Sequence, residues 1–174
     1  DAIGEAIGRP INHDAELSDP NQMCRLAINK MFSMRPEEAS EADKLLARAF
    51  DLDPKAIYLG WRAQLRTIQC AERHMQDNSE YIESARSYIA RALELEPMNS
   101  MVLATSASAR LIMERDVNGS LHLAKRGVGL NSANPMGWLV LSMGKLYAGE
   151  PKEAMKMARL ARRITALSPH GFFC

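Results

Sequence analysis

The feature that most constrains this chain is a set of small and apolar residues that recurs four times. In the first copy Ala42, Leu46 and Ala49 are followed by Pro54. The other copies repeat this order with weaker matches: Ala85, Ile89, Ala92 and Pro97; Ser120, Ala124, Gly127 and Ser132; Ala154, Ala158, Ala161 and Ala166. The first positions of successive copies are 43, 35 and 34 residues apart. Self-similarity at such a period indicates a repeat architecture, in which each unit buries its apolar face against the next.

The spacing within each copy predicts a helix that packs closely against a neighbour. Ala42 and Ala49 are seven positions apart and share one helix face, and Leu46 fills the gap between them. Pro54 and Pro97 follow their helices directly, where a proline ring cannot continue the helix. No alternating β-branched run indicates a strand. We expect helices near 20–34, 37–51, 55–75, 78–95, 99–114, 118–130, 135–147 and 151–166.

The last copy carries the most complete sequence signature. It runs from Asn134-Pro135-Met136-Gly137-Trp138 through Leu141 to Gly149 and Ala154. With the closing prolines of the earlier copies, this signature resembles the tetratricopeptide repeat family. Ser142 and Lys145 replace the family's usual Gly and Tyr, and the third copy lacks its closing Pro. The resemblance covers residues 20 to about 166 and implies an all-α solenoid of about four antiparallel helical hairpins.

The chain is predicted to contain three segments. Residues 1–19 are interpreted as a linker or the end of an upstream domain, 20–166 as the helical repeat domain, and 167–174 as the start of a truncated further helix. The 43-residue spacing between the first two copies is longer than the other two spacings, and the extra residues lie between Pro54 and Ala85. We expect them to form a first helix two turns longer than its neighbours, with His74 and Met75 near the tip of a projecting hairpin.

Charge and cysteine usage narrow the classes of function. The 22 basic and 21 acidic residues give a formal net charge of +1, so there is no global attraction to nucleic acid or an anionic membrane. No apolar run approaches the roughly 18 residues that span a bilayer. Three cysteines without a Cys-x-x-Cys motif argue against a disulfide framework. We therefore expect a cytoplasmic protein with no membrane partner and no nucleic-acid partner through this segment.

The polar residues form no recognisable catalytic or metal-binding motif. The four histidines lie on different elements without ligand-like spacing. Gly4-x-x-x-Gly8 is not followed by the Gly-Lys-Ser/Thr of a phosphate loop. Carboxylates such as Asp53 and Glu96, just before the closing prolines, are interpreted as turn residues. The expectation is a protein that is not an enzyme and holds no metal or cofactor.

The family resemblance places a binding surface on the first helices, which line the concave groove of such solenoids. Members that grip acidic C-terminal peptides carry Lys, Arg and Asn there, whereas the positions in this chain are apolar and rich in Met. This composition favours adaptable hydrophobic binding of a protein or peptide. Coverage by a flanking domain or by a second copy in a homodimer is the open alternative. The predicted groove residues are Val102, Thr105, Met136, Leu139, Val140 and Met143, with Ser106 and Ala109 beside them and Cys24, Ala27, Ile28 and Met31 in the first unit.

A basic stripe is predicted on the last helix. Lys152, Lys156, Arg159 and Arg163 are spaced by four, three and four residues and so share one face, with Arg162 beside them. The stripe is interpreted either as a solvated outer face or as a docking patch for an acidic partner or, despite the balanced overall charge, for nucleic acid.

The predicted function is a protein–protein interaction scaffold. The alternative is a regulatory or oligomerisation segment of a signalling protein. The run from Asn134-Pro135 to Ala154 is similar to the C-terminal repeat regions of bacterial transcriptional regulators and of adenylate or guanylate cyclase-type proteins.

Overall fold

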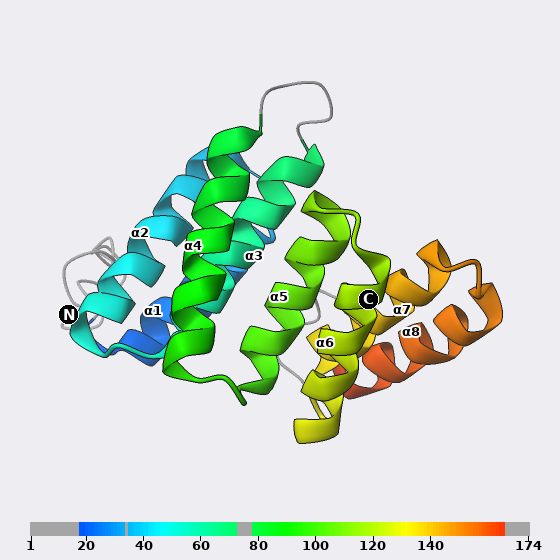
Figure 1. Cartoon of the computed structure of the whole chain (residues 1–174). Coiled ribbons are helices and arrows are strands. Elements are labelled where there is room, and N and C mark those ends of the chain that lie inside the picture. The colour runs from blue at the N-terminus through cyan, green and yellow to red at the C-terminus, as the bar shows by residue number, and fades with distance from the viewer. Residues whose placement is uncertain (1–17, 34, 73–77, 166–174) are drawn as a thin grey trace, which may run out of the picture.

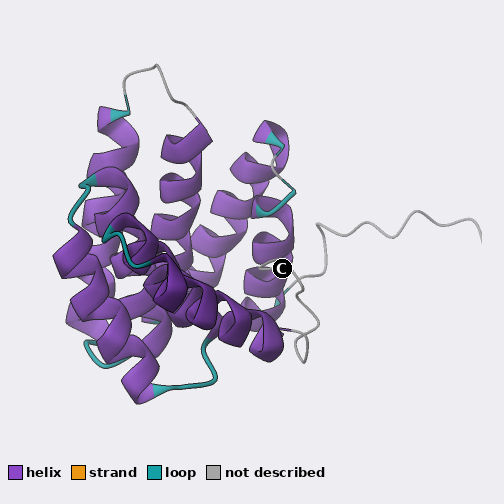
Figure 2. Ribbon diagram, turned by 90° about the vertical axis from the view of Figure 1, so that its right-hand side faces the viewer, coloured by secondary structure: helices purple, strands orange, loops and turns teal. Residues whose placement is uncertain are grey.

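The computed structural model describes residues 18–33, 35–72 and 78–165, and all regular structure in these ranges is helical. All eight expected helices are present, with their ends within three residues of the expected positions. They are α1 (Pro20–Met31), α2 (Pro36–Leu52), α3 (Ala56–Glu72), α4 (Ser79–Leu95), α5 (Ser100–Met113), α6 (Val117–Leu130), α7 (Pro135–Tyr147) and α8 (Pro151–Thr165). Figure 2 shows helices joined by loops, with no strand in the described part of the chain.

The helices pair as four consecutive antiparallel hairpins that follow one another along an array (Figure 1). Each first helix packs against its own second helix, and α5 also packs against the first helices on either side of it, α3 and α7. This arrangement is the tetratricopeptide-like solenoid that the repeat pattern predicts.

Local capping residues set where the helices begin. Asp19, Asn99 and Asn134 are the N-caps of α1, α5 and α7, and their side chains accept hydrogen bonds from backbone N–H groups of the first turn. Such caps satisfy donors that have no partner within the helix. At the opposite end of α7, Gly149 has a φ of 78°, a backbone conformation that suits glycine, and this allows the tight turn into α8.

The small residues of the repeat occupy the helix contacts as predicted. Ala42, Ala49, Ala85 and Ala92 are fully buried. In the last hairpin Ala154 and Ala161 are buried while Ala158 is only half-buried. The difference arises because α8 is the last described helix, so no later hairpin in this part of the chain packs over it.

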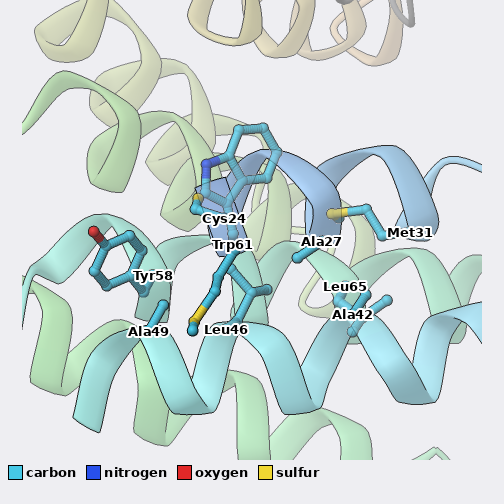
Figure 3. Packing of buried hydrophobic residues seen from close by; sticks show 10 residues of the cluster. Cys24, Ala27, Met31, Ala42, Leu46, Ala49, Tyr58, Trp61 and Leu65 are labelled. Atoms are coloured by element: carbon cyan, nitrogen blue, oxygen red, sulfur yellow. The ribbon is translucent and has the colours of Figure 1, made fainter. Parts of the chain in front are cut away.

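The first three helices enclose a core of large side chains (Figure 3). Leu46 of α2 and Tyr58 and Trp61 of α3 are buried there. The Trp61 ring meets Phe32 edge-on, with ring centroids 6.4 Å apart. Aromatic pairs in this geometry stabilise a core beyond the area that they bury.

The long second unit distributes its extra residues differently from the expectation. Over the described residues α3 has 17 residues, and α5 and α7 have 14 and 13. The second helix of the unit, α4, also has 17 residues, three more than α6. Part of the extra length therefore lies in α4, whereas the sequence pattern assigns all of it to the first helix. His74 and Met75 lie outside the described residues, as do 1–17 and 166–174, where most of the two predicted flanking segments fall.

Candidate functional site

Three consecutive first helices and the residue after α1 surround one open hollow of about 400 Å³, which we call the first-helix hollow. Its lining residues come from α3, α5 and α7 in turn, and Phe32 adds to the wall from the end of α1. They are Phe32, Gln64, Thr67, Ile68, Ala71, Ser108, Ile112, Met136, Leu139 and Met143.

Helical periodicity explains why these residues meet. On α3, Gln64, Ile68 and Ala71 are separated by four and three positions, so their side chains share one face. The lining residues of α5 are four apart, and those of α7 are three and four apart. Because a solenoid places equivalent helices side by side, the three faces turn towards the same space.

Among the described residues that line it, the first-helix hollow is uncharged and mostly apolar. None of its ten lining residues is Asp, Glu, Lys, Arg or His. Ile68, Ile112, Leu139 and Met143 are partly exposed, so apolar side chains remain accessible. A contiguous apolar surface of this kind commonly marks a contact site.

Three buried polar side chains also line the hollow. Gln64, Thr67 and Ser108 are 7%, 2% and 5% exposed. The Thr67 hydroxyl donates a hydrogen bond of 2.9 Å to the carbonyl oxygen of Ala63. The side-chain oxygen of Gln64 has no hydrogen-bond partner among the described residues.

The structure divides the predicted groove residues into two groups. Leu139 and Met143 line the first-helix hollow and are partly exposed. Met136 also lines it but is 2% exposed and packs in the core with α5 and α6. Val102, Thr105 and Val140 are 0%, 0% and 1% exposed, so they lie inside the solenoid, and their assignment to a partner surface is corrected.

The three misassigned residues fill contacts between neighbouring helices. Val102 packs in a cluster with Ala56 and Leu59 of α3. A Cβ atom added to Gly60 of α3 would lie 3.0 Å from Thr105 Oγ1, which shows how closely the two helices approach. The physical reason for the error is that α5 packs on both sides, so its two flanks are core rather than groove. Val140 packs in the core formed with α5 and α6.

The first-unit candidates lie in the core of the first hairpin. Cys24, Ala27 and Met31 are buried, and the partly buried Ile28 packs against the same cluster. Of the described residues of this unit, Phe32 alone lines the first-helix hollow. Ser106 and Ala109 of α5 are likewise buried.

Sequence reasoning missed the contribution of α3. Gln64, Thr67, Ile68 and Ala71 supply the longest stripe of the hollow but were not among the predicted residues. The 43-residue spacing between the first two copies made it unclear which α3 residues correspond to the groove positions of the other first helices. The four-three spacing of Gln64, Ile68 and Ala71 is the signal that could have identified the stripe.

The basic stripe is exposed along α8. Lys152, Lys156, Arg159 and Arg163 all face solvent, as does Arg162. Lys156 forms an ion pair of 2.6 Å with Glu153. Docking of an acidic partner on this stripe stays a prediction.

The described cysteines are not activated thiols. Burial raises the pKa of Cys24 to about 12, against a smaller opposing effect of Arg25, and burial also raises the pKa of Cys70. Both thiols stay protonated at neutral pH and are weak nucleophiles. In the described ranges no group of three or more His, Cys, Asp or Glu could hold a metal ion. None of the described helices has both the length and the apolarity needed to cross a membrane.

The fold and site together define a helical-hairpin solenoid with an uncharged hollow on its first-helix side. No family model matches the sequence, and no curated protein matches it. Among solved structures the chain is similar to the crystal structure of the MamA protein. The two are 14% identical with a TM-score of 0.43, and the match covers 84% of this chain and 73% of the other. A likeness of this degree says nothing about function.

Proposed function

We propose that this chain is a protein-interaction scaffold whose first-helix hollow holds an uncharged, apolar segment of a partner protein. The observation that carries this proposal is the convergence of α3, α5 and α7 on one open hollow without a charged side chain. Partly exposed Leu139, Met143 and Ile112 supply apolar surface that an occupant would cover. The methionines can adjust their rotamers to occupants of different shape.

The dimensions of the hollow suit a short stretch of polypeptide. Packed helices lie about 8–10 Å apart, so a surface from α3 across α5 to α7 extends over roughly 16–20 Å. An extended chain rises about 3.3 Å per residue, so this surface accommodates five or six residues.

The uncharged lining selects against charged occupants. Moving an unpaired carboxylate or ammonium group out of water is costly, and no lining residue offers the opposite charge. The proposed partner segment is therefore apolar at the residues that enter the hollow, with any charges outside it.

A peptide-display selection tests this proposal. Random 12-residue peptides are selected on the immobilised chain, and the best binder is synthesised and titrated against wild type and the double variant Leu139→Asp, Met143→Asp. The matched control is Leu146→Asp, Met155→Asp, which changes the same residue types on the same hairpin at positions that are 60% and 55% exposed and outside the hollow.

We expect the selection to yield uncharged apolar peptides. They should bind the hollow variant at least tenfold more weakly than wild type and bind the control variant as tightly as wild type. Circular dichroism should show that both variants keep their helical content, since Leu139 and Met143 are partly exposed. Equal binding to wild type and the hollow variant would contradict the proposal, and so would unfolding of the hollow variant, because the two side chains would then belong to the core.

A further inference from the structure

We infer that Gln64 makes the first-helix hollow selective for polypeptide, because its side-chain amide hydrogen-bonds to the backbone of the bound segment. This inference rests on the proposed function and names the group that recognises the occupant. The observation behind it is an uncommon one. Gln64 is 93% buried, lines the hollow, and its Oε1 atom has no hydrogen-bond partner within the described residues.

A buried acceptor without a partner is unfavourable. Most buried polar side-chain atoms are hydrogen-bonded, and each one left unpaired loses the interaction that it had with water. A Gln at this position therefore costs stability unless something that enters the hollow supplies a donor.

The surroundings of Gln64 show where that donor must come from. Ile68, Ala71, Leu139 and Met143 are apolar and donate nothing. The Thr67 hydroxyl already donates to the carbonyl oxygen of Ala63. Ser108 is the other polar residue of the lining, but its hydroxyl does not bond to Gln64 Oε1, which has no partner among the described residues. The occupant is therefore the proposed source of the missing donor.

The chemistry of the side chain favours a peptide over other apolar occupants. Every residue of a polypeptide except proline carries an N–H donor and a C=O acceptor, whereas a hydrocarbon chain carries neither. The Gln64 amide has both a carbonyl oxygen and an NH₂ group. Oε1 has almost no accessible surface in the described structure, so the amide bonds the N–H and the C=O of a single extended residue after rotation about its terminal torsion. The apolar walls then hold side chains while Gln64 fixes the position of the backbone.

The test combines backbone N-methylation with substitution of Gln64. Each amide of the peptide selected above is methylated in turn, which removes one N–H donor at a time. Every peptide is titrated against wild type, Gln64→Met and Gln69→Met. Methionine matches glutamine in length without its amide, and Gln69 is the matched control because it lies on the same helix, bonds to Arg66 and does not line the hollow.

We expect one methylated position to weaken binding to wild type and to Gln69→Met about tenfold, as loss of a buried hydrogen bond does. The same methylation should leave binding to Gln64→Met unchanged, since that variant has no acceptor to lose. Hydrogen exchange of the bound peptide provides a second measurement that needs no variant. It should show the same amide strongly protected.

Two results would overturn the inference, and they are distinguishable. If every methylation weakens binding to wild type and Gln64→Met equally, or no peptide amide is protected, Gln64 does not bond the backbone although the hollow still binds peptide. If the selected peptides bind equally well to the Leu139→Asp, Met143→Asp variant, the proposed function itself fails and this inference fails with it.

Discussion

The first half of the solenoid (α1–α4) and the second half (α5–α8) fill the same repeat position with side chains of different size. Leu46 of α2 and Ala124 of α6 hold the same position in the repeat, and both are fully buried. In the first half the large Leu46 packs among Tyr58 and Trp61. In the second half Ala124 packs in a cluster that contains Ala104 and Ala107 beside the larger Met136 and Leu141. One repeat frame therefore accepts either a large or a small buried side chain at its central position.

A semi-buried ion network adds to the first half. Asp43 of α2 accepts hydrogen bonds of 2.8 Å from Arg62 and 2.7 Å from Arg66, both on α3. The Arg62 guanidinium also lies 4.3 Å from the ring centroid of Tyr88 on α4, and Arg66 lies 5.8 Å from that of Tyr81. Charge-assisted bonds and cation–π contacts thus connect three helices.

Close backbone approaches also hold the second half together. A Cβ atom on Gly127 would lie 3.1 Å from the carbonyl oxygen of Ser100, and one on Gly137 would lie 2.7 Å from Val128 Cγ1. The Ser100 hydroxyl donates a hydrogen bond of 2.9 Å to the Gly127 carbonyl, and Asn134 donates to Ser100 at 2.8 Å. These contacts require small residues, so the second half should tolerate enlargement poorly.

The largest expected effect is loss of volume in the first half. Leu46→Ala should lower the free energy of unfolding by about 2–5 kcal/mol, because it removes buried methyl groups and leaves a cavity. Urea denaturation followed by circular dichroism measures the change. A loss below about 1 kcal/mol would mean that the first half closes over the cavity, and the contrast between the halves would be wrong.

The ion network should give the next largest effect. Burial raises the pKa of the Asp43 carboxyl. The hydrogen bonds from Arg62 and the charge of Arg66 outweigh burial, so the pKa of Asp43 lies below its ordinary value. Asp43→Asn should cost about 2–3 kcal/mol, because two partly buried guanidinium groups lose their counter-ion.

The pH dependence of this effect has a definite sign. A carboxylate with a lowered pKa stabilises the fold above its unfolded pKa of about 3.9, and this stabilisation is lost as the pH falls through the lower folded value. Wild type should therefore lose stability below about pH 4 relative to pH 7, and Asp43→Asn should lack that part of the loss. Parallel stability–pH curves for the two proteins would show that the network contributes nothing.

The smallest expected effect is the reciprocal substitution in the second half. Ala124→Leu should cost about 1–3 kcal/mol, since the added methyl groups have no space between helices in close contact. Differential scanning calorimetry of this variant beside Leu46→Ala compares the same two residues in both halves. A higher melting temperature for Ala124→Leu would show that the second half is underpacked, and the comparison would have to be redrawn.

Much of the fold could be predicted from the sequence because its determinants are local. The seven-residue spacing of Ala42 and Ala49 and the closing prolines Pro54 and Pro97 act within one or two helical turns. Such signals located all eight helices and the buried small positions. The prediction was less accurate where the register shifts, because the extra length of the second unit is shared between α3 and α4.

The candidate site was only partly predictable. Leu139 and Met143 could be placed on an accessible face of their helix from periodicity alone. Val140 and Val102 have the same apolar character and fall on the same helices, yet they are buried. Periodicity describes the faces of one helix and does not say which neighbouring helix covers each face.

The sequence by itself determined the helices, their pairing into hairpins and the uncharged character of the first-helix surface. These properties depend on residue type and on spacings of three, four and seven positions, which every chain with this sequence carries before it folds. Only the tertiary structure decided that Gln64 of α3, Ser108 of α5 and Met143 of α7 share one hollow, and that the Gln64 oxygen has no described partner there. Those facts depend on how far each hairpin rotates and shifts against the next, which is set by the combined packing of side chains from several helices.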